Sequence, residues 1–230
     1  MSKIFNKEWL ILFVLISLLI VLSPSIIVAQ KDEEIFENIK LPSNVEELVQ
    51  SFNYMSYDVV VLRNGQKSQD STIEYDYLGK DKVDAVETDK VSFVVQDKIN
   101  EDIPSDMLFW FEGTDIKKMK IDGEIISAQM AGVMGDRLLS AIFSPFYSLS
   151  NYDIQKLSKV GKVSHSQEKF GGEEVKVTIV EVENIPEYEI ESGTIKLVKY
   201  EGMSFVTSFN YISSTEDLVI DFDVNEIKFN

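Results

Sequence analysis

The chain has 230 residues, 44 % of them hydrophobic and 11 % aromatic, so it is long enough for a well-packed domain and too apolar to be disordered throughout. Its formal net charge of −17 argues against nucleic-acid binding and against adsorption to an anionic membrane surface, because both depend on Lys and Arg. The chain has no cysteine, which excludes disulfide bonds, a thiolate nucleophile and a lipid-modified cysteine.

The first 29 residues have the pattern of an export signal. Two lysines precede the uncharged segment 9–22, Pro24 interrupts it, and the small side chain of Ala29 suits a cleavage site. An uncleaved anchor is the alternative, because about 21 uncharged residues up to Ala29 are enough to span a bilayer. In both cases we expect the rest of the chain to lie outside the cytoplasmic membrane, in the periplasm or a similar compartment.

A charged stretch at 30–42 is interpreted as a linker, and a short amphipathic helix is predicted over 43–52. Ser43 with Glu46 three residues later has the spacing of a capping box. The apolar residues that follow fall at i, i+3, i+4 and i+7, which places them on one helical face: Val45, Leu48, Val49 and Phe52.

After Asn53 the apolar residues alternate with polar ones, which predicts strands, and turn signals such as Asn64-Gly65 recur every eight to twelve residues or so. This spacing favours an antiparallel meander, a sandwich or a barrel, and the two halves of the chain do not repeat. The predicted strands are 54–63, 71–78, 82–88, 90–96, 107–113, 115–121, 124–127, 161–170, 173–183, 193–200, 204–211 and 217–230.

An apolar segment at 127–147 interrupts the strands, and we predict a helix over 128–143 that Pro145 ends, with a further short helix over 151–158. A sheet with one apolar face must cover it, and few helices are available for that purpose. The economical architecture is therefore one strongly curved antiparallel sheet wrapped around the helices. On a helical wheel, one side of the 128–143 helix carries Met130, Val133, Met134, Leu138, Ala141 and Ile142.

This helix is either a plug that fills the concave face of the sheet or a lid over an apolar cavity. An apolar stripe is usually plain core, and the strand MLFWF at 107–111 is likewise typical of a strand buried on both faces. Gly132 and Gly135 weaken the helix and its methionines are adaptable, which favours a lid. The cavity of such a lid would be lined by Phe109, Phe111, Met130, Met134, Leu138, Ile142 and Phe146.

The sequence lacks the residue patterns of the common enzyme classes, so we expect no catalytic site, no metal and no cofactor. The single histidine, His165, lies in a polar alternating strand, where its serine neighbours point to the opposite face. Acidic residues are too numerous for any glycosidase-like pair to stand out. Asp221 and Asp223 form an Asp-x-Asp pair, for which a strand edge facing water and a calcium site are the two interpretations, and no glycine-rich phosphate loop is present.

Three stretches resemble the LolA/LppX-like superfamily of periplasmic lipid and lipoprotein carriers: LVQSFNYMSYDVVVLRNG (48–65), SGTIKLVKYEGMSFVTSFNY (192–211) and IDFDVNEIKFN (220–230). The resemblance covers the exported part in outline. It implies a half-opened β-barrel of about eleven strands, closed by helices, with a cavity for acyl chains. The chain departs from these carriers in one respect, because neither of its two arginines, Arg63 and Arg137, matches the position of their functional arginine.

The sequence thus predicts a mainly β (α+β) half-barrel domain over 43–230, following a linker at 30–42 and a signal peptide or anchor helix at 1–29. The expected function is non-enzymatic binding, and carriage, of a lipid or lipoprotein acyl chain, driven by about 0.8 kcal/mol per buried CH₂. An envelope membrane or a receptor protein would be the partner, and nucleic acid would not. The alternatives are a structural or interaction protein of the cell envelope with a filled core and no ligand, and, less favoured, an exported hydrolase.

Overall fold

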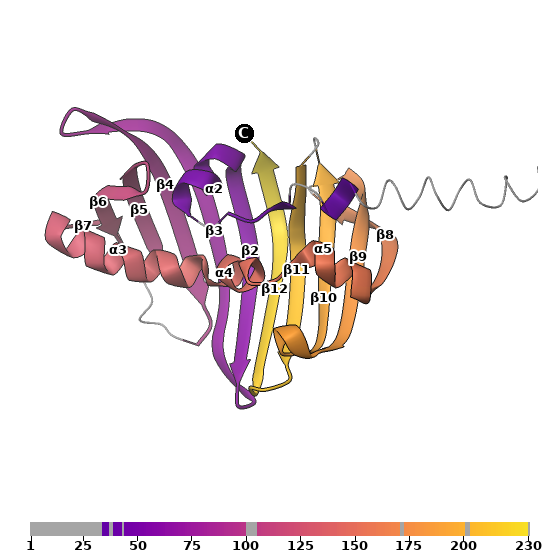
Figure 1. Cartoon of the computed structure of the whole chain (residues 1–230). Coiled ribbons are helices and arrows are strands. Elements are labelled where there is room, and N and C mark those ends of the chain that lie inside the picture. Colours follow the sequence, from indigo (N-terminus) through magenta and orange to yellow (C-terminus); the bar gives the residue numbers. More distant parts are fainter. Residues whose placement is uncertain are drawn as a thin grey trace, which may run out of the picture.

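The computed structural model describes residues 34–36, 39–42, 44–99, 105–170, 173–200 and 203–229 (Figure 1). The predicted signal or anchor segment at 1–29 lies outside the described residues, as do parts of the linker. Within the described part of the chain, no helix is both long enough and apolar enough to cross a membrane.

The described residues form twelve strands and a few helices. The strands are β1 (Ile39–Lys40), β2 (Phe52–Arg63), β3 (Gln66–Val83), β4 (Val86–Asp97), β5 (Asp106–Glu112), β6 (Asp115–Ile121), β7 (Glu124–Ile126), β8 (Lys162–Phe170), β9 (Glu173–Ile185), β10 (Ile190–Tyr200), β11 (Met203–Ser213) and β12 (Leu218–Phe229). The α-helices are α2 (Val45–Ser51), α3 (Ala128–Ile142), α4 (Ser144–Ser150) and α5 (Ile154–Val160), and the 3₁₀ helices are η1 (Glu34–Phe36) and η2 (Pro186–Tyr188).

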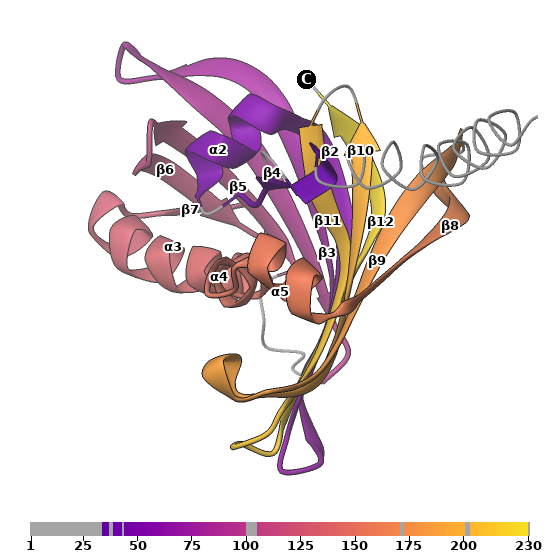
Figure 2. The same cartoon turned by 45° about the vertical axis from the view of Figure 1, so that its right-hand side comes forward.

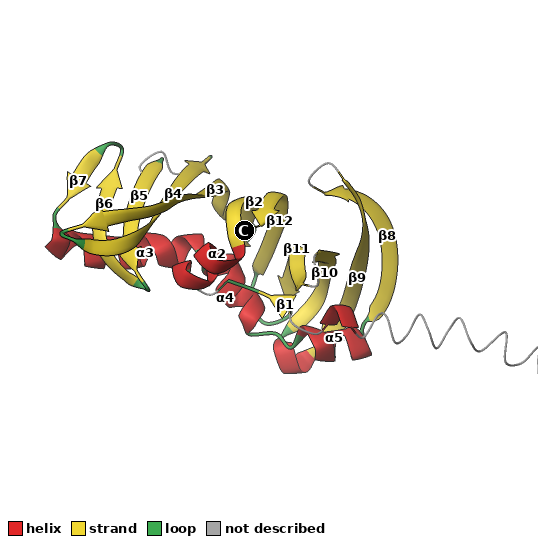
Figure 3. Cartoon of the chain, turned by 90° about the horizontal axis from the view of Figure 1, so that it is seen from above, coloured by secondary structure: helices red, strands yellow, loops and turns green. Residues whose placement is uncertain are grey.

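All twelve strands belong to one sheet, which is open rather than closed. Eleven of them follow the order β7-β6-β5-β4-β3-β2-β12-β11-β10-β9-β8, each antiparallel to its neighbours, while β1 pairs in parallel with β11. The sheet is curved, and the helices lie across one of its faces (Figure 3). The predicted fold class, a mainly β chain with a single large antiparallel sheet of about eleven strands and a few helices, is confirmed for the described residues.

The sheet is built from two meanders that meet in its middle. Strands β2 to β7 run outward to one edge, and β8 to β12 return from the other edge, so that β12 pairs with β2 from Leu218 opposite Arg63 to Phe229 opposite Phe52. The chain between the edge strands β7 and β8 forms α3, α4 and α5. These three helices cross the sheet as a strap from one edge to the other, on one side of it (Figure 2).

The sheet splits locally between β11 and β12. The two strands pair only from Ser208 to Ile212, and β12 then continues along β2, while β1 lies beside β11 at Ser204 and Phe205. Aromatic rings fill this split, since the ring centroid of Phe229 lies 5.3 Å from that of Phe205 and 5.5 Å from that of Phe52. The short first strand therefore completes a gap that the divergence of β12 creates.

Strand β5 is buried on both faces. Phe109 and Phe111 lie on the helix side, and Trp110, only 5 % exposed, lies on the opposite face. There its Nε1 donates a hydrogen bond to Asp81, 2.8 Å away, and the ammonium groups of Lys90 and Lys118 lie 5.2 and 4.8 Å from its ring centroid. The doubly buried interpretation of this aromatic strand is therefore correct, and a cation–π cluster covers its outer face.

The predicted start of the first helix is wrong. The predicted helix begins later, at Val45, and its N-cap is Asn44, whose side-chain Oδ1 accepts a hydrogen bond from the backbone N–H of Glu47 at 3.0 Å. Asn is as good an N-cap as Ser, and the predicted cap, Ser43, lies outside the described residues. The predicted apolar face of the helix is correct, because Val45, Leu48 and Phe52 are buried.

The predicted strand over 82–88 is a hairpin instead, in which β3 turns into β4 through Asp84 and Ala85. Both residues have positive φ, 51° and 68°, as the two central residues of a type I′ turn require. The turn contains no glycine, and Ala is rare in this conformation, so no local sequence pattern indicated a turn here.

The helices after β7 also differ in detail from the prediction. Pro145 does not only end a helix but also lies in the first turn of α4, where its missing N–H costs nothing. The short helix expected over 151–158 is α5, displaced by about one turn.

Candidate ligand-binding face

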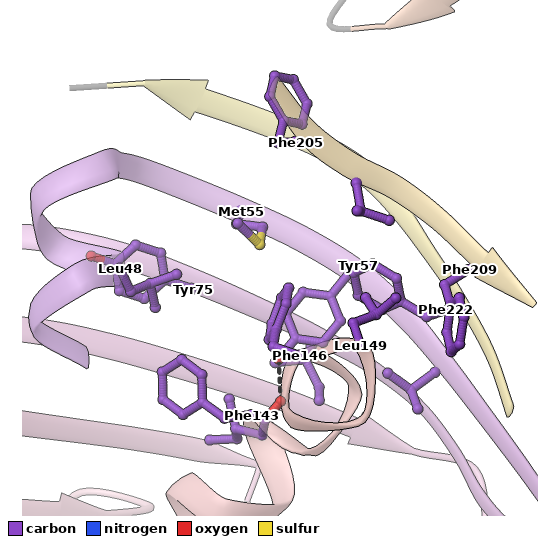
Figure 4. Packing of buried hydrophobic residues seen from close by; sticks show 14 of the residues in the cluster. Leu48, Met55, Tyr57, Tyr75, Phe143, Phe146, Leu149, Phe205, Phe209 and Phe222 are labelled. Atoms are coloured by element: carbon purple, nitrogen blue, oxygen red, sulfur yellow. Dashed lines mark hydrogen bonds between the residues drawn. The ribbon is translucent and has the colours of Figure 1, made fainter. Parts of the chain in front are cut away.

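The concave face of the sheet, under the helices, is lined by aromatic and aliphatic side chains. Phe109 stacks on Phe111 with ring centroids 5.5 Å apart, and Phe93 meets Phe109 edge-on at 5.9 Å. From the helices, Phe143 packs against Phe93, and Phe146 packs against Phe222 at 5.3 Å (Figure 4). Period-two alternation in each strand places these rings on one face, so neighbouring strands together form a continuous apolar surface.

The helical strap is tied to the sheet by a buried hydrogen bond in the middle of this face. The hydroxyl of Tyr57 on β2 donates to the backbone carbonyl of Ile142 at the end of α3, at 2.7 Å (dashed in Figure 4). Burial raises the pKa of the Tyr57 hydroxyl, which therefore stays protonated and remains a donor. The bond also satisfies one of the carbonyls that the end of a helix leaves without an intrahelical partner.

Helix α3 approaches the sheet most closely at Gly135. A Cβ built on this residue would collide with Cδ1 of Ile116 and would lie 3.5 Å from the ring of Phe109. A side chain at this position would therefore have to displace the end of Ile116, where α3 packs on strands β5 and β6. Gly132, one turn earlier, has open space around the same position.

Four of the seven predicted cavity residues come together in the core. Phe109, Phe111, Ile142 and Phe146 are each at most 4 % exposed and belong to one buried cluster. Met134 and Leu138 are partly buried and pack against that cluster. Met130 does not belong with them, because 54 % of its surface is exposed.

The helical wheel therefore placed α3 in the wrong rotation about its axis. Val133 is 62 % exposed and Ala141 is exposed, whereas Ala131 and Gly135 are buried against the sheet. Small side chains let the helix backbone approach the bulky rings of β5, and this contact turns the larger Met130 and Val133 outward. Hydrophobicity alone could not predict this rotation, since it ranks Met and Val above Ala and Gly.

Half-open grooves surround α2 and the middle of the strap. A groove of about 370 Å³ runs between α2 and strands β3 and β4, with Val49, Tyr77, Lys80 and Asp89 in its lining, and another of about 270 Å³ separates α2 from α3. Val45 and Phe111 line both grooves. A third, of about 290 Å³, lies between α4 and the lower ends of β2 and β12. The described part of the concave face is thus packed at its centre and accessible at its margins.

One polar group under the helices has no protein partner. Tyr75 on β3 is fully buried, and its hydroxyl makes no hydrogen bond to any described residue. Its ring packs on Phe93 at 5.5 Å. Strand alternation places Tyr75 on the apolar face of β3 together with Ile73 and Tyr77.

The residues considered for catalysis or metal binding lie apart from the concave face. His165 is exposed on β8, with Nδ1 3.2 Å from Oγ1 of Thr178, as expected for an exposed strand residue. Asp223 is also exposed, and Asp221 accepts a hydrogen bond from the side-chain amide of Asn210 at 3.5 Å. Among the described residues, no group of three or more His, Cys, Asp or Glu side chains is arranged to hold a metal ion.

No protein-family model matches the chain, and no curated protein matches it by sequence. Its structure is similar to that of a DUF1329 family protein from Desulfovibrio piger, with 15 % identity, a TM-score of 0.31, and 81 % of this chain and 89 % of that chain covered. It is also similar to a chain of the Pseudomonas aeruginosa MucA/MucB complex, with 13 % identity, a TM-score of 0.35, and 86 % and 57 % covered, so the chain spans little more than half of that one.

A domain from Vibrio parahaemolyticus, described as an outer membrane lipoprotein-sorting protein domain, is similar over 77 % of this chain and 84 % of its own, with 9 % identity and a TM-score of 0.23. Such a sorting domain is the kind of protein that the sequence resembles. Because these TM-scores are low, the function is argued below from the geometry of this chain alone.

Proposed function

We propose that the chain is an exported, non-enzymatic protein that binds a lipid or the acyl chain of a lipoprotein on the concave face of its sheet. The observation that supports this most directly is the construction of that face. It is a continuous apolar surface of an open sheet, and the cover over it is a strap of separate helices rather than a second sheet. Helices that pack by side chains can be lifted without breaking the hydrogen bonds between strands.

The strength of binding would come from apolar burial. At about 0.8 kcal/mol per CH₂, a sixteen-carbon chain would gain roughly 12 kcal/mol before the costs of ordering the chain and displacing the helices. The grooves beside α2 and α4 give such a chain two places to begin, and the adaptable Met134 lies partly buried on the strap. In this proposal α3 acts as a lid, and carriage to an envelope membrane or receptor would follow from reversible opening.

Native mass spectrometry with lipid extraction tests the proposal. The full chain is expressed with its own N-terminus, purified without harsh detergent, and compared with Leu138→Trp, which enlarges a side chain between the strap and the sheet. The matched control is Met130→Trp, on the exposed side of the same helix. We expect a co-purifying lipid in the wild type and the control, and its loss or replacement in Leu138→Trp. A wild-type protein that stays lipid-free after incubation with fatty acids and phospholipids contradicts the proposal.

A structural or interaction protein of the cell envelope is the second candidate, and the packing supports it. The rings of Phe109, Phe111 and Phe146 are buried against other rings, as in an ordinary filled core. In that case α3 is a plug. A lipid-free protein whose stability does not respond to added lipids is the result expected for this candidate.

A further inference from the structure

The buried hydroxyl of Tyr75 is a hydrogen-bond donor without an acceptor among the described residues. Buried polar groups are nearly always paired, so a buried group without a partner calls for an explanation. Tyr75 is fully buried and its hydroxyl has no partner among the described residues. Tyr57, on the neighbouring strand and the same face, shows the usual arrangement, since its hydroxyl donates to the carbonyl of Ile142.

The hydroxyl of Tyr75 points toward the part of the face that α2 covers. In Figure 4 it is directed from the sheet toward α2, in the direction of Leu48, which is 2 % exposed. Tyr77 lies two residues along the same strand, about 7 Å away, and lines the groove of about 370 Å³ between α2 and β3. A ligand that enters this groove and moves α2 aside would therefore reach Tyr77 first and Tyr75 next.

Helix α2 is suited to such a movement. It has seven residues, which is too few for a helix to be stable by itself, so its position depends on the packing of Val45 and Leu48. An apolar chain that occupies the place of Leu48 would replace that packing with its own.

The charges around the groove decide which kind of acceptor fits. Asp76 and Asp89 are the charged groups whose electrostatic effect reaches Tyr75, and Lys80 at the mouth is already paired with Asp89 at 2.8 Å. A carboxylate placed beside Tyr75 would be buried without a cation, because Lys80 is already paired, and this disfavours it. A neutral carbonyl avoids this cost. Burial also raises the pKa of the Tyr75 hydroxyl, so it keeps the proton that it would donate.

We propose that Tyr75 donates a hydrogen bond to the ester carbonyl of a bound acyl chain, so that the face selects esterified lipids over free fatty acids. This inference rests on the proposed function and deepens it by naming the ligand class. The residue touches the ligand and takes no part in any reaction.

The test compares the full chain with its Tyr75→Phe variant, using a fatty acid and its methyl ester of the same chain length as probes. We expect the wild type to bind the ester more tightly and Tyr75→Phe to lose about three- to tenfold in ester affinity, the range of one neutral hydrogen bond, with little change for the acid. The variant without ligand should melt at the same or a higher temperature, since it loses only an unpaired buried hydroxyl.

Tyr57→Phe is the matched control, because it removes a hydroxyl that has a partner. It should melt at a lower temperature than the wild type and keep the preference for the ester. Equal ester affinity in the wild type and Tyr75→Phe overturns the inference and leaves the proposed function standing. A Tyr75→Phe variant that melts at as low a temperature as Tyr57→Phe has the same consequence. If neither probe binds the wild type, the proposed function itself fails, and this inference with it.

Discussion

At the residue scale, the two glycines of α3 have opposite roles although they are one turn apart. Gly135 lies where the helix touches Ile116, and Gly132 has free space around it. We expect Gly135→Val to lower the free energy of unfolding by about 1–3 kcal/mol, because the new side chain must displace Ile116 and crowd the ring of Phe109. Gly132→Ala should raise it by roughly 1 kcal/mol through helix propensity. Urea denaturation of both variants checks the pair, and equal effects of the same sign would contradict this packing.

The carboxylate of Asp81 makes stability depend on pH. The hydrogen bond from Trp110 and a second from the backbone N–H of Lys82 hold its pKa below the ordinary value of 3.8. A carboxyl whose pKa is lowered in the folded state stabilises it above the unfolded pKa, and this contribution is lost as the pH falls below about 3.8.

Asp81→Asn isolates this effect from that of the other acidic residues. We expect the wild type to have the higher urea midpoint at pH 6, with the difference shrinking between pH 5 and pH 3. Emission from Trp110 reports on the transition directly, because Trp9 is the only other tryptophan. A difference that is constant across this pH range would show that Asp81 is not held in its ionised form by these bonds.

At the element scale, the β3–β4 hairpin is held by a turn that its sequence disfavours. Ala85 has φ of 68°, in the left-handed region where an L-residue with a Cβ is strained. Ala85→Gly should therefore raise the free energy of unfolding by up to about 1 kcal/mol. Gly65→Ala, in the hairpin between β2 and β3 with φ of 69° at Gly65, is the reciprocal change and should lower it. Thermal unfolding measures both, and a destabilised Ala85→Gly would mean that the turn does not adopt this conformation in solution.

The elements also show what the sequence could predict. Period-two alternation located nearly all of the strands, and the spacing of Val45, Leu48 and Phe52 identified the buried face of α2 correctly. The β3–β4 turn was missed because Asp84 and Ala85 reach positive φ without glycine. The rotation of α3 was wrong because contact with the rings of β5 selects small residues, and that contact is created by the tertiary structure. Phe109, Phe111, Ile142 and Phe146 are buried in the core, as their large apolar side chains and their positions in the predicted strand and the apolar segment 127–147 led us to expect.

At the scale of the whole molecule, the order of the strands could not be read from the sequence. The pairing of β2 with β12 joins residues more than 150 positions apart, and no local pattern encodes it. Strand alternation left a meander, a sandwich and a barrel open, and the need of one apolar sheet face to be covered by few helices favoured a single curved antiparallel sheet. The ligand-binding role of the predicted residues stays a prediction, for which the lipid-extraction experiment is the test.

The β2–β12 pair makes the integrity of the sheet depend on the last strand. We expect a chain that ends at residue 217 to fail to fold, because both meanders would then expose an unpaired edge in the middle of the sheet and lose Phe222 from the core. Far-UV circular dichroism and urea denaturation detect this.

The central position of the last strand also bears on when the protein can take its final shape. During synthesis the first meander would emerge long before the residues that hold it to the second, so the sheet cannot be completed until β12 has left the ribosome. For a chain whose N-terminus has the pattern of an export signal, this delay is an advantage. If the chain is exported as its N-terminal pattern predicts, a polypeptide that still lacks β12 would be unfolded enough to pass through a narrow channel, and its sheet would be completed afterwards.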